Sequence, residues 1–258
     1  FPQLPQVACF DTAFHRTLSP LETTFAIDKS LTASGVRRYG FHGLSYQYVS
    51  QVLQRMSPRA AQRTVMAHLG NGASVCATTA HASRATTMGF SALDGLMMGT
   101  RSGAIDPGVL LYLMEQGWNH DKIQKLLYKQ SGLLGVSGES ADMRTLRASA
   151  SEAARFAVDL FTHRVVREVG ALSACVGGLD VLAFTGGIGE HDAVLRQHVG
   201  EALAYLGVRV DSSRNQAAVG DATQAIHADD SRVEVWVIPT DEGRVAAQEA
   251  LSLLPLAG

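Results

Sequence analysis

The chain has 258 residues, of which 46% are hydrophobic and 18% are charged, and its formal net charge is −2 at pH 7. A chain of this length and composition can bury one large core or two modest ones. Its net charge is slightly negative, whereas proteins that bind nucleic acid or an anionic membrane typically carry an excess of positive charge. The three cysteines are widely spaced, so they predict neither a disulfide framework nor a metal site, and they favour a reducing, cytoplasmic location.

Apolar runs typical of strands alternate along the chain with patterns typical of helices, which predicts an α/β fold. The expected strands cover residues 6–10, 64–69, 73–79, 180–185 and 233–238. The expected helices cover residues 43–56, 106–116, 120–129, 151–176, 191–205 and 242–254. Gly70-Asn71-Gly72 is a hairpin signal, so the second and third strands should pair antiparallel. The pattern predicts one compact unit.

The helix expected over 151–176 has the clearest pattern. Its start matches a capping box at Ser149 and Glu152, and Gly177-Gly178 should end it. Apolar residues at helical spacing should form its buried face: Phe156, Leu160, Val165, Val169, Leu172 and Val176.

Three candidate catalytic residues lie beside predicted strands and helices. Asp11 and Glu242 end the first and last predicted strands, where α/β proteins hold metals and catalytic bases, although such carboxylates as often cap a helix. His42 follows Phe41 and precedes Gly43, so it is either a buried core histidine or a reactive one with room for a partner.

Three glycine-rich segments complete the set. Arg101 stands between Gly99 and Gly103, just before a helix that Asp106 should cap, and its forked donors suit an oxyanion. The turn over 70–72 can direct backbone N–H groups at a phosphate, and the strand-to-helix turn over 185–190 lets a nucleotide approach the backbone. Each segment alone is also compatible with a purely structural turn.

Together these residues form an inventory for phosphoryl transfer. Arginine and histidine donors, carboxylates that could hold Mg²⁺, and backbone cradles for a nucleotide are what this chemistry requires. The sequence lacks GxSxG, HExxH, CxxC and P-loop motifs, so the other common reaction classes have less support.

Seven segments together resemble the acetate kinases over essentially the whole chain: FDTAFH (10–15), RRYGFHGLS (37–45), HLGNGAS (68–74), MGFSALDGLMMGTRSGAIDPG (88–108), SGLLGVSGESADMR (131–144), FTGGIGE (184–190) and VIPTDE (237–242). The resemblance implies the acetate and sugar kinase/Hsp70/actin fold, in two domains with a cleft between them. It implies a cytoplasmic homodimer that reversibly transfers phosphate from ATP to acetate, giving acetyl phosphate and ADP. Propionate or butyrate kinase, or an inactive nucleotide-binding remnant, are the alternatives.

The same resemblance assigns roles to individual residues. His42 and Arg101 would stabilise the transferring phosphoryl group, Asp11 would be an active-site carboxylate, and Glu242 would bind Mg²⁺ or, in its place, Mn²⁺. The phosphate-contacting turn would comprise His68, Leu69, Gly70, Asn71 and Gly72. The adenosine pocket would be lined by Asp142, Met143, Arg144, Gly187, Ile188, Gly189, Glu190 and His191.

Three departures from the family pattern stand out. Tyr46 occupies a position where the family usually has a second histidine, and Asp241 replaces an asparagine beside the metal-binding glutamate. The family's amino-terminal domain, with a phosphate loop and a second arginine, has no counterpart here. We therefore expect residues 1–12 to end that domain, 13–242 to form the nucleotide-binding domain, 243–258 to pack back toward the missing part, and the chain alone to be inactive.

Overall fold

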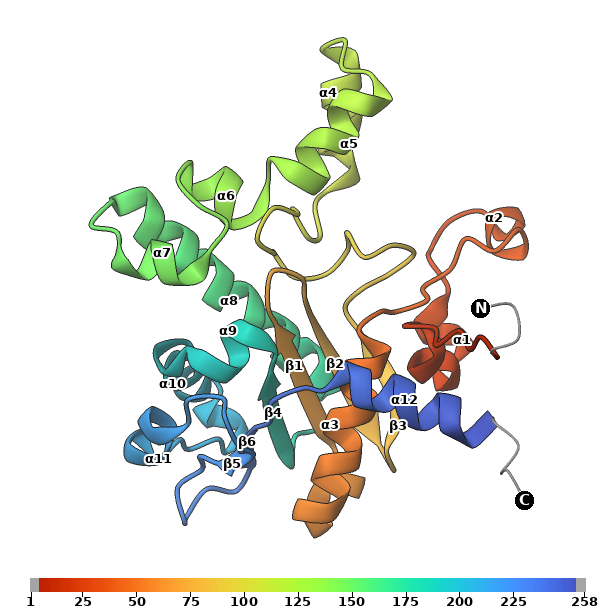
Figure 1. The fold of residues 1–258 in the computed structure, drawn as a ribbon. Helices are drawn as coiled ribbons and strands as arrows, with labels where there is room; N and C mark the ends of the chain where they lie inside the picture. The colour runs from red at the N-terminus through yellow and green to blue at the C-terminus, as the bar shows by residue number, and fades with distance from the viewer. Residues whose placement is uncertain (1–4, 254–258) are drawn as a thin grey trace.

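A six-stranded mixed sheet forms the centre of the molecule in the computed structural model, which describes residues 5–253 (Figure 1). The strand order is β3-β2-β1-β4-β6-β5. The strands are β1 (Thr64–Leu69), β2 (Ala73–Thr79), β3 (Ala82–Thr86), β4 (Val181–Thr185), β5 (Gln224–Ala225) and β6 (Glu234–Val237). The β1, β4 and β6 strands run parallel to one another, so their carboxyl ends lie at one edge of the sheet.

The predicted hairpin is confirmed, because β1 and β2 pair antiparallel up to Leu69 opposite Ala73. Alternate side chains of β1 point to opposite faces of the sheet, as the period of a strand requires. Val65, Ala67 and Leu69 enter the core on one face, and Met66 enters a second core on the other.

Helices cover both faces of the sheet. The long helix α8 (Glu152–Cys175) packs on β1, β2 and β3. On the opposite face, α3 (Gly43–Met56) packs on β1, and α12 (Glu242–Leu253) packs on α3. Figure 1 shows α3 and α12 side by side across the strands.

The remaining helices are short or lie outside these two layers. The α4 and α5 helices project away from the sheet at the top of Figure 1. The bounds are α1 (Pro20–Thr23), α2 (Lys29–Ala33), α4 (Pro107–Glu115), α5 (His120–Lys129), α6 (Gly132–Ser137), α7 (Met143–Ala148), α9 (Gly186–His191), α10 (Ala193–Ala202) and α11 (Ser212–Ala217), with 3-10 turns at Ala13–Thr17, Pro58–Ala61 and Ala204–Leu206. None of the helices within residues 5–253 has the length and apolar character needed to cross a bilayer.

The strand predicted over residues 6–10 is wrong. This segment pairs with no strand in the described part of the chain. Phe10 is 69% exposed, and the half-buried Cys9 contacts the Ala246 carbonyl oxygen on α12 instead of a strand. The other four predicted strands correspond to β1, β2, β4 and β6, and each is confirmed to within one residue at either end.

Three helix predictions need correction. Ser151, not Ser149, caps α8 by accepting from the Ala154 N–H, while Ser149 Oγ accepts from the Ser151 N–H before the helix and donates to Glu139. Phe156 lies on the exposed side of α8 rather than on its buried face. The helix expected over 191–205 begins at Ala193, where the Asp192 carboxylate caps it through the Leu195 N–H.

The last helix agrees with its predicted start and is described as far as Leu253, so the predicted positions from 254 onward lie outside the described residues. The predicted cap at Asp106 is confirmed, since its carboxylate accepts from the Gly108 N–H at 2.8 Å and Pro107 opens α4. The division of the chain after residues 12 and 242 stays a prediction.

Candidate active site

Three segments meet at the carboxyl edge of the sheet: the turn over 70–72 after β1, the glycine-rich first turn of α9 (186–189) directly after β4, and residues 240–242, which lead from β6 into α12. In α/β sheets this edge is where ligands bind. Gly186 has a φ of +75°, and a Cβ there would lie 2.7 Å from the Leu69 carbonyl oxygen. A Cβ on Gly70 would lie 3.9 Å from the Gly187 nitrogen. The two glycine turns therefore adjoin, and only glycine permits the approach at Gly186.

Arg101 and His42 converge on the first of these turns. A Cβ added to Gly72 would lie 2.7 Å from Arg101 Nη2 and 3.2 Å from His42 Nε2. The segment that carries Arg101 is held there because the Gly99 N–H donates to the Asn71 carbonyl oxygen at 3.0 Å. Two side chains from distant parts of the sequence thus face one stretch of bare backbone.

In the part of the chain that the structure describes, the Arg101 guanidinium makes one hydrogen bond, from Nη1 to the Ala92 carbonyl oxygen at 2.6 Å. Within residues 5–253, no carboxylate oxygen lies within 4 Å of it. Partial burial lowers the pKa of Arg101 from its usual value. A guanidinium nevertheless stays protonated in proteins. A half-buried cation beside a glycine turn is suited to bind an oxyanion with its forked donors.

His42 adopts a left-handed conformation at the start of α3, with φ of 57° and ψ of 27°. A non-glycine residue in this region is uncommon and strained, and such strain clusters at functional sites. Asp11 stabilises the arrangement, since its Oδ2 accepts from the His42 N–H at 2.7 Å. The structure therefore gives Asp11 the helix-capping role that the sequence left open, through its contact with the His42 backbone.

His42 and His68 stack with ring centroids 4.2 Å apart and planes inclined by 23°. Burial, followed by the charge of Arg101, lowers the pKa of His42 to about 4. Burial, followed by the effect of His42, lowers the pKa of His68 to about 3. Both imidazoles are therefore neutral near pH 7, and the positive charge of the site resides on Arg101.

Two serines hold the stacked histidines. Ser74 Oγ lies 2.8 Å from His42 Nδ1, and Ser45 Oγ lies 2.8 Å from His68 Nδ1. The Thr240 hydroxyl donates to Ser45 Oγ at 2.9 Å, which extends the network to the turn after β6. Neither serine was predicted as a site residue, although Ser45 and Ser74 lie inside two of the motifs quoted for the resemblance.

Glu242, the first residue of α12, shares its surroundings with Asp11. Burial, and then the charge of Asp11, raise the pKa of Glu242. The described residues contain no group of three or more histidines, cysteines, aspartates and glutamates that could hold a metal ion. The charge of Asp11 acts on Glu242, and a pair of carboxylates in one region fits Mg²⁺, which binds one or two carboxylates together with phosphate oxygens and waters. Asp241 instead caps α12, accepting from the Arg244 N–H at 2.9 Å.

Glu190 joins the turns after β4 and β6. Its buried Oε1 accepts from the Gly186 N–H at 2.8 Å and from the Thr240 N–H at 3.0 Å. Glu190 therefore holds the backbone at Gly186 and at Thr240 in a fixed relative position. Of its neighbours, Gly187 and His191 are exposed, Ile188 is half-buried and Gly189 is buried.

The segment Asp142-Met143-Arg144 begins α7 close to the first turn. Asp142 caps the helix through the Thr145 N–H and pairs with the exposed Arg144 at 3.1 Å, while the Met143 side chain is buried in the core. A Cβ on Gly99 would lie 3.3 Å from the Ala141 carbonyl oxygen. The structure thus brings this segment beside Gly99, but Met143 and the fully buried Leu69 can offer only their backbone.

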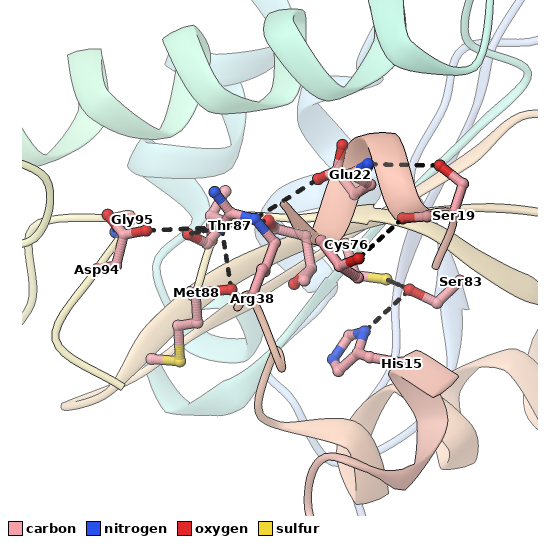
Figure 2. Close-up of polar contacts among 12 residues, drawn as sticks. His15, Ser19, Glu22, Arg38, Cys76, Ser83, Thr87, Met88, Asp94 and Gly95 are labelled. Atoms are coloured by element: carbon pink, nitrogen blue, oxygen red, sulfur yellow. Dashed lines mark hydrogen bonds and ion pairs between the residues drawn. The ribbon is translucent and has the colours of Figure 1, made fainter. Parts of the chain in front are cut away.

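A second polar cluster, around Arg38, shapes the loop that supports Arg101 (Figure 2). Arg38 Nη1 donates to the carbonyl oxygens of Thr86, Thr87 and Met88 at 3.0–3.1 Å. It also pairs with Asp94 at 3.5 Å. The loop between these contacts contains Ala92, whose carbonyl oxygen accepts from Arg101.

The model of the acetokinase family matches residues 1–248 of the chain. The chain is 53% identical to an acetate kinase of Rhodopseudomonas palustris and 45% identical to one of Rickettsia felis. The alignments cover 98% of this chain, but 64% and 66% of those relatives. The chain therefore spans about two thirds of their length.

Solved structures agree with the sequence comparison. The acetate kinase of Porphyromonas gingivalis matches with a TM-score of 0.91 at 39% identity, over 95% of this chain and 63% of that one. A propionate kinase from Francisella tularensis matches with a TM-score of 0.91 at 40% identity, over 98% of this chain and 66% of that one. These matches confirm the predicted fold of the acetate and sugar kinase/Hsp70/actin type. With the family model and these relatives in agreement, the chain belongs to the acetokinase family.

Proposed function

We propose that the protein transfers a phosphoryl group reversibly between ATP and acetate, forming acetyl phosphate and ADP. The observation that carries this proposal is the approach of Arg101 Nη2 and His42 Nε2 to Gly72 at the carboxyl edge of the sheet. The names of the acetate kinases among its relatives support acetate as the acceptor. Propionate, named for one structural neighbour, and butyrate are the alternative acceptors.

In this proposal ATP lies across the turn of His68, Leu69, Gly70, Asn71 and Gly72. An acetate oxygen attacks the γ-phosphorus in line, the bond from that phosphorus to the bridging oxygen breaks, and ADP leaves with the electron pair. Arg101 donates hydrogen bonds to the equatorial oxygens as their charge grows, and neutral His42 adds a further donor. Donors fixed before the reaction stabilise such a transition state without reorganising.

The carboxylates have separate tasks in this mechanism. Glu242 would hold Mg²⁺, or Mn²⁺ in its place, with Asp11 near enough to add negative charge to the same space. The metal ion, when bound, neutralises phosphate charge. Asp11 also keeps its backbone contact with His42, and so it sets the position of that imidazole.

The adenosine side would be formed by two surfaces. Asp142, Met143 and Arg144 lie on one side, beside Gly99. Gly187, Ile188, Gly189, Glu190 and His191 form the other, with Gly187 exposed to a ligand. Backbone contacts rather than long side chains would hold the nucleotide here.

This 258-residue chain alone should bind ADP weakly and turn over acetate negligibly. Its two glycine turns are formed, whereas the chain spans about two thirds of the length of its relatives, and the resemblance places a phosphate loop and a second arginine in the part not covered. Calorimetry with ADP and a coupled kinase assay on the same sample test both parts. Turnover as fast as that of an ordinary kinase would contradict the proposal that groups outside this chain are needed.

We also propose that the full-length protein is a cytoplasmic homodimer. The α4 helix supports this, because Leu111, Tyr112 and Met114 on it are 62%, 58% and 55% exposed in the single chain. Exposed apolar side chains gathered on one helix favour association, and a symmetric dimer in which α4 packs against α4 of its partner would bury both copies. We propose neither nucleic acid nor a membrane as a partner.

Sedimentation velocity on the full-length natural protein tests this surface. We expect a dimer that becomes monomeric when Leu111→Glu places a charge on α4. Leu21→Glu, a change at a residue that is 94% exposed on a different helix, should leave the dimer intact. A monomeric parent protein, or a dimer unaffected by Leu111→Glu, would argue against α4 as the interface.

A further inference from the structure

Tyr46 lies fully enclosed beneath the histidine pair, at the position where the resemblance leads one to expect a histidine. Its side chain is 0% exposed and belongs to the core between the sheet and α3. The phenol is in short hydrogen-bond contact with Ser74 Oγ, and Ser74, also fully buried, lies 2.8 Å from His42 Nδ1. Tyr46, Ser74 and His42 therefore form one chain of hydrogen bonds that leads from the core to the candidate active site.

Counting donors and acceptors shows which group donates in each hydrogen bond of this Tyr46–Ser74–His42 network. Among residues 5–253, Ser74 Oγ is the side-chain partner recorded for the Tyr46 hydroxyl. If Ser74 donated to Tyr46, the phenol proton would be left without an acceptor, and a buried unsatisfied donor costs roughly 1–3 kcal/mol. Tyr46 therefore donates to Ser74.

Ser74 then has one hydroxyl proton left to give. Its oxygen already accepts from Tyr46, and its other recorded side-chain partner is His42 Nδ1. Because the enclosed hydroxyl must donate where an acceptor is available, Ser74 donates to Nδ1. A neutral imidazole that accepts at one nitrogen carries its proton on the other.

We propose that Tyr46 is a positioning residue that, through Ser74, holds His42 in the neutral tautomer with its proton on Nε2. That nitrogen lies 3.2 Å from the Cβ position of Gly72, beside Arg101 Nη2 at 2.7 Å from the same point. The tautomer aims an N–H donor at the space that Arg101 also faces. The opposite tautomer would present a lone pair there, which repels an anionic phosphoryl oxygen. This catalytic consequence rests on the proposed phosphoryl transfer, but the tautomer itself does not.

The burial of the network agrees with this assignment. Burial raises the pKa of Tyr46 well above its usual range, so the phenol keeps the proton that it donates. Burial lowers the pKa of His42 to about 4, so the imidazole is neutral and free to accept at Nδ1. The groups that act on it electrostatically are Arg101, on the loop before α4, and His15, on the 3-10 turn before α1.

Nitrogen NMR of the full-length natural protein with ¹⁵N-labelled histidine tests the tautomer directly. In the parent protein, His42 should show a protonated, pyrrole-type Nε2 and a pyridine-type Nδ1. Tyr46→Phe removes the first donor, so Ser74 is free to accept from Nδ1–H, and both tautomers should become populated. The matched control is Tyr39→Phe, which removes a hydroxyl that donates to the Gly35 carbonyl oxygen at 2.8 Å, and it should leave the His42 signals unchanged.

Kinetics test the catalytic consequence. Tyr46→Phe should lower kcat by about 3–10-fold with little change in the KM for ATP, the pattern of an interaction made in the transition state. Tyr39→Phe should leave kcat unchanged. A His42 that carries its proton on Nδ1 in the parent protein overturns the proposal, and this result does not require any variant to fold. A shifted tautomer in Tyr46→Phe with unchanged kcat would overturn the catalytic role alone. Failure of the parent protein to phosphorylate acetate would refute the proposed function, but the NMR test of the tautomer would still apply.

Discussion

Replacing Arg101 with alanine in the full-length natural protein should lower kcat for acetyl phosphate formation by about 10²–10³-fold, which corresponds to roughly 3–4 kcal/mol. The KM for ATP should change much less. The reason is that the guanidinium faces the bare turn at Gly72 with one internal hydrogen bond and no carboxylate within 4 Å in the described chain, so its donors are available as charge grows on the phosphoryl oxygens. Steady-state kinetics with both substrates measure the two parameters separately.

Two further variants sharpen this test. Arg101→Lys should restore little of the lost rate, because a point charge does not reproduce the planar fork of donors. Arg214→Ala, which removes an exposed guanidinium paired with Asp229, should leave kcat unchanged. A folded Arg101→Ala protein with a kcat close to that of the parent would remove Arg101 from the mechanism.

Replacing Arg196 with methionine should destabilise the fold by about 3–5 kcal/mol. This side chain is fully buried and donates to five acceptors, namely Asn215 Oδ1 and the carbonyl oxygens of Gly189, Glu190, Asn215 and Ala218. Burial lowers the pKa of Arg196 to about 10, so it is charged at neutral pH. Methionine fills part of the same space but has no donors, so it leaves these buried acceptors unsatisfied.

Thermal unfolding measures the effect. For a domain of this size, about 3–5 kcal/mol corresponds to a fall in Tm of roughly 6–20 °C. The matched control is Arg214→Met, because this exposed side chain makes a surface ion pair of the kind worth about 1 kcal/mol or less. Equal falls in Tm for the two variants would contradict the structural role of the buried guanidinium. Nucleotide affinity should also fall in Arg196→Met, since the carbonyl groups that it holds end the glycine turn after β4.

The central sheet could be predicted from the sequence because its signals are local. The run of β-branched and apolar residues in β1 and β2 and the Gly70-Asn71-Gly72 turn between them specify a hairpin without reference to the rest of the chain. The strand expected over 6–10 has a similar composition, yet it lacks a neighbour to pair with among the described residues. Composition thus indicates which segments can form strands, while pairing partners decide which of them do.

In the candidate site, too, some residues could be predicted from local sequence and others could not. Arg101, His42 and the glycine turns could be identified because their motifs lie at the ends of predicted elements. The Asp11 contact with the His42 backbone could not, since it joins residues 31 positions apart through a left-handed backbone conformation that no local pattern announces. The sequence marks Tyr46 only as a departure from the histidine usual in the family, whereas the structure encloses it in the core and connects it to the site through Ser74.

Hydroxamate detection of acyl phosphate, carried out with the full-length natural protein, acetate, ATP and Mg²⁺, tests the proposed function most directly. We predict formation of acetyl hydroxamate that depends on all three components and is lost in Arg101→Ala. Propionate and butyrate, supplied in place of acetate at the same concentration, should react more slowly. A folded protein that binds ADP but forms no acyl hydroxamate from any of these acids would contradict the account.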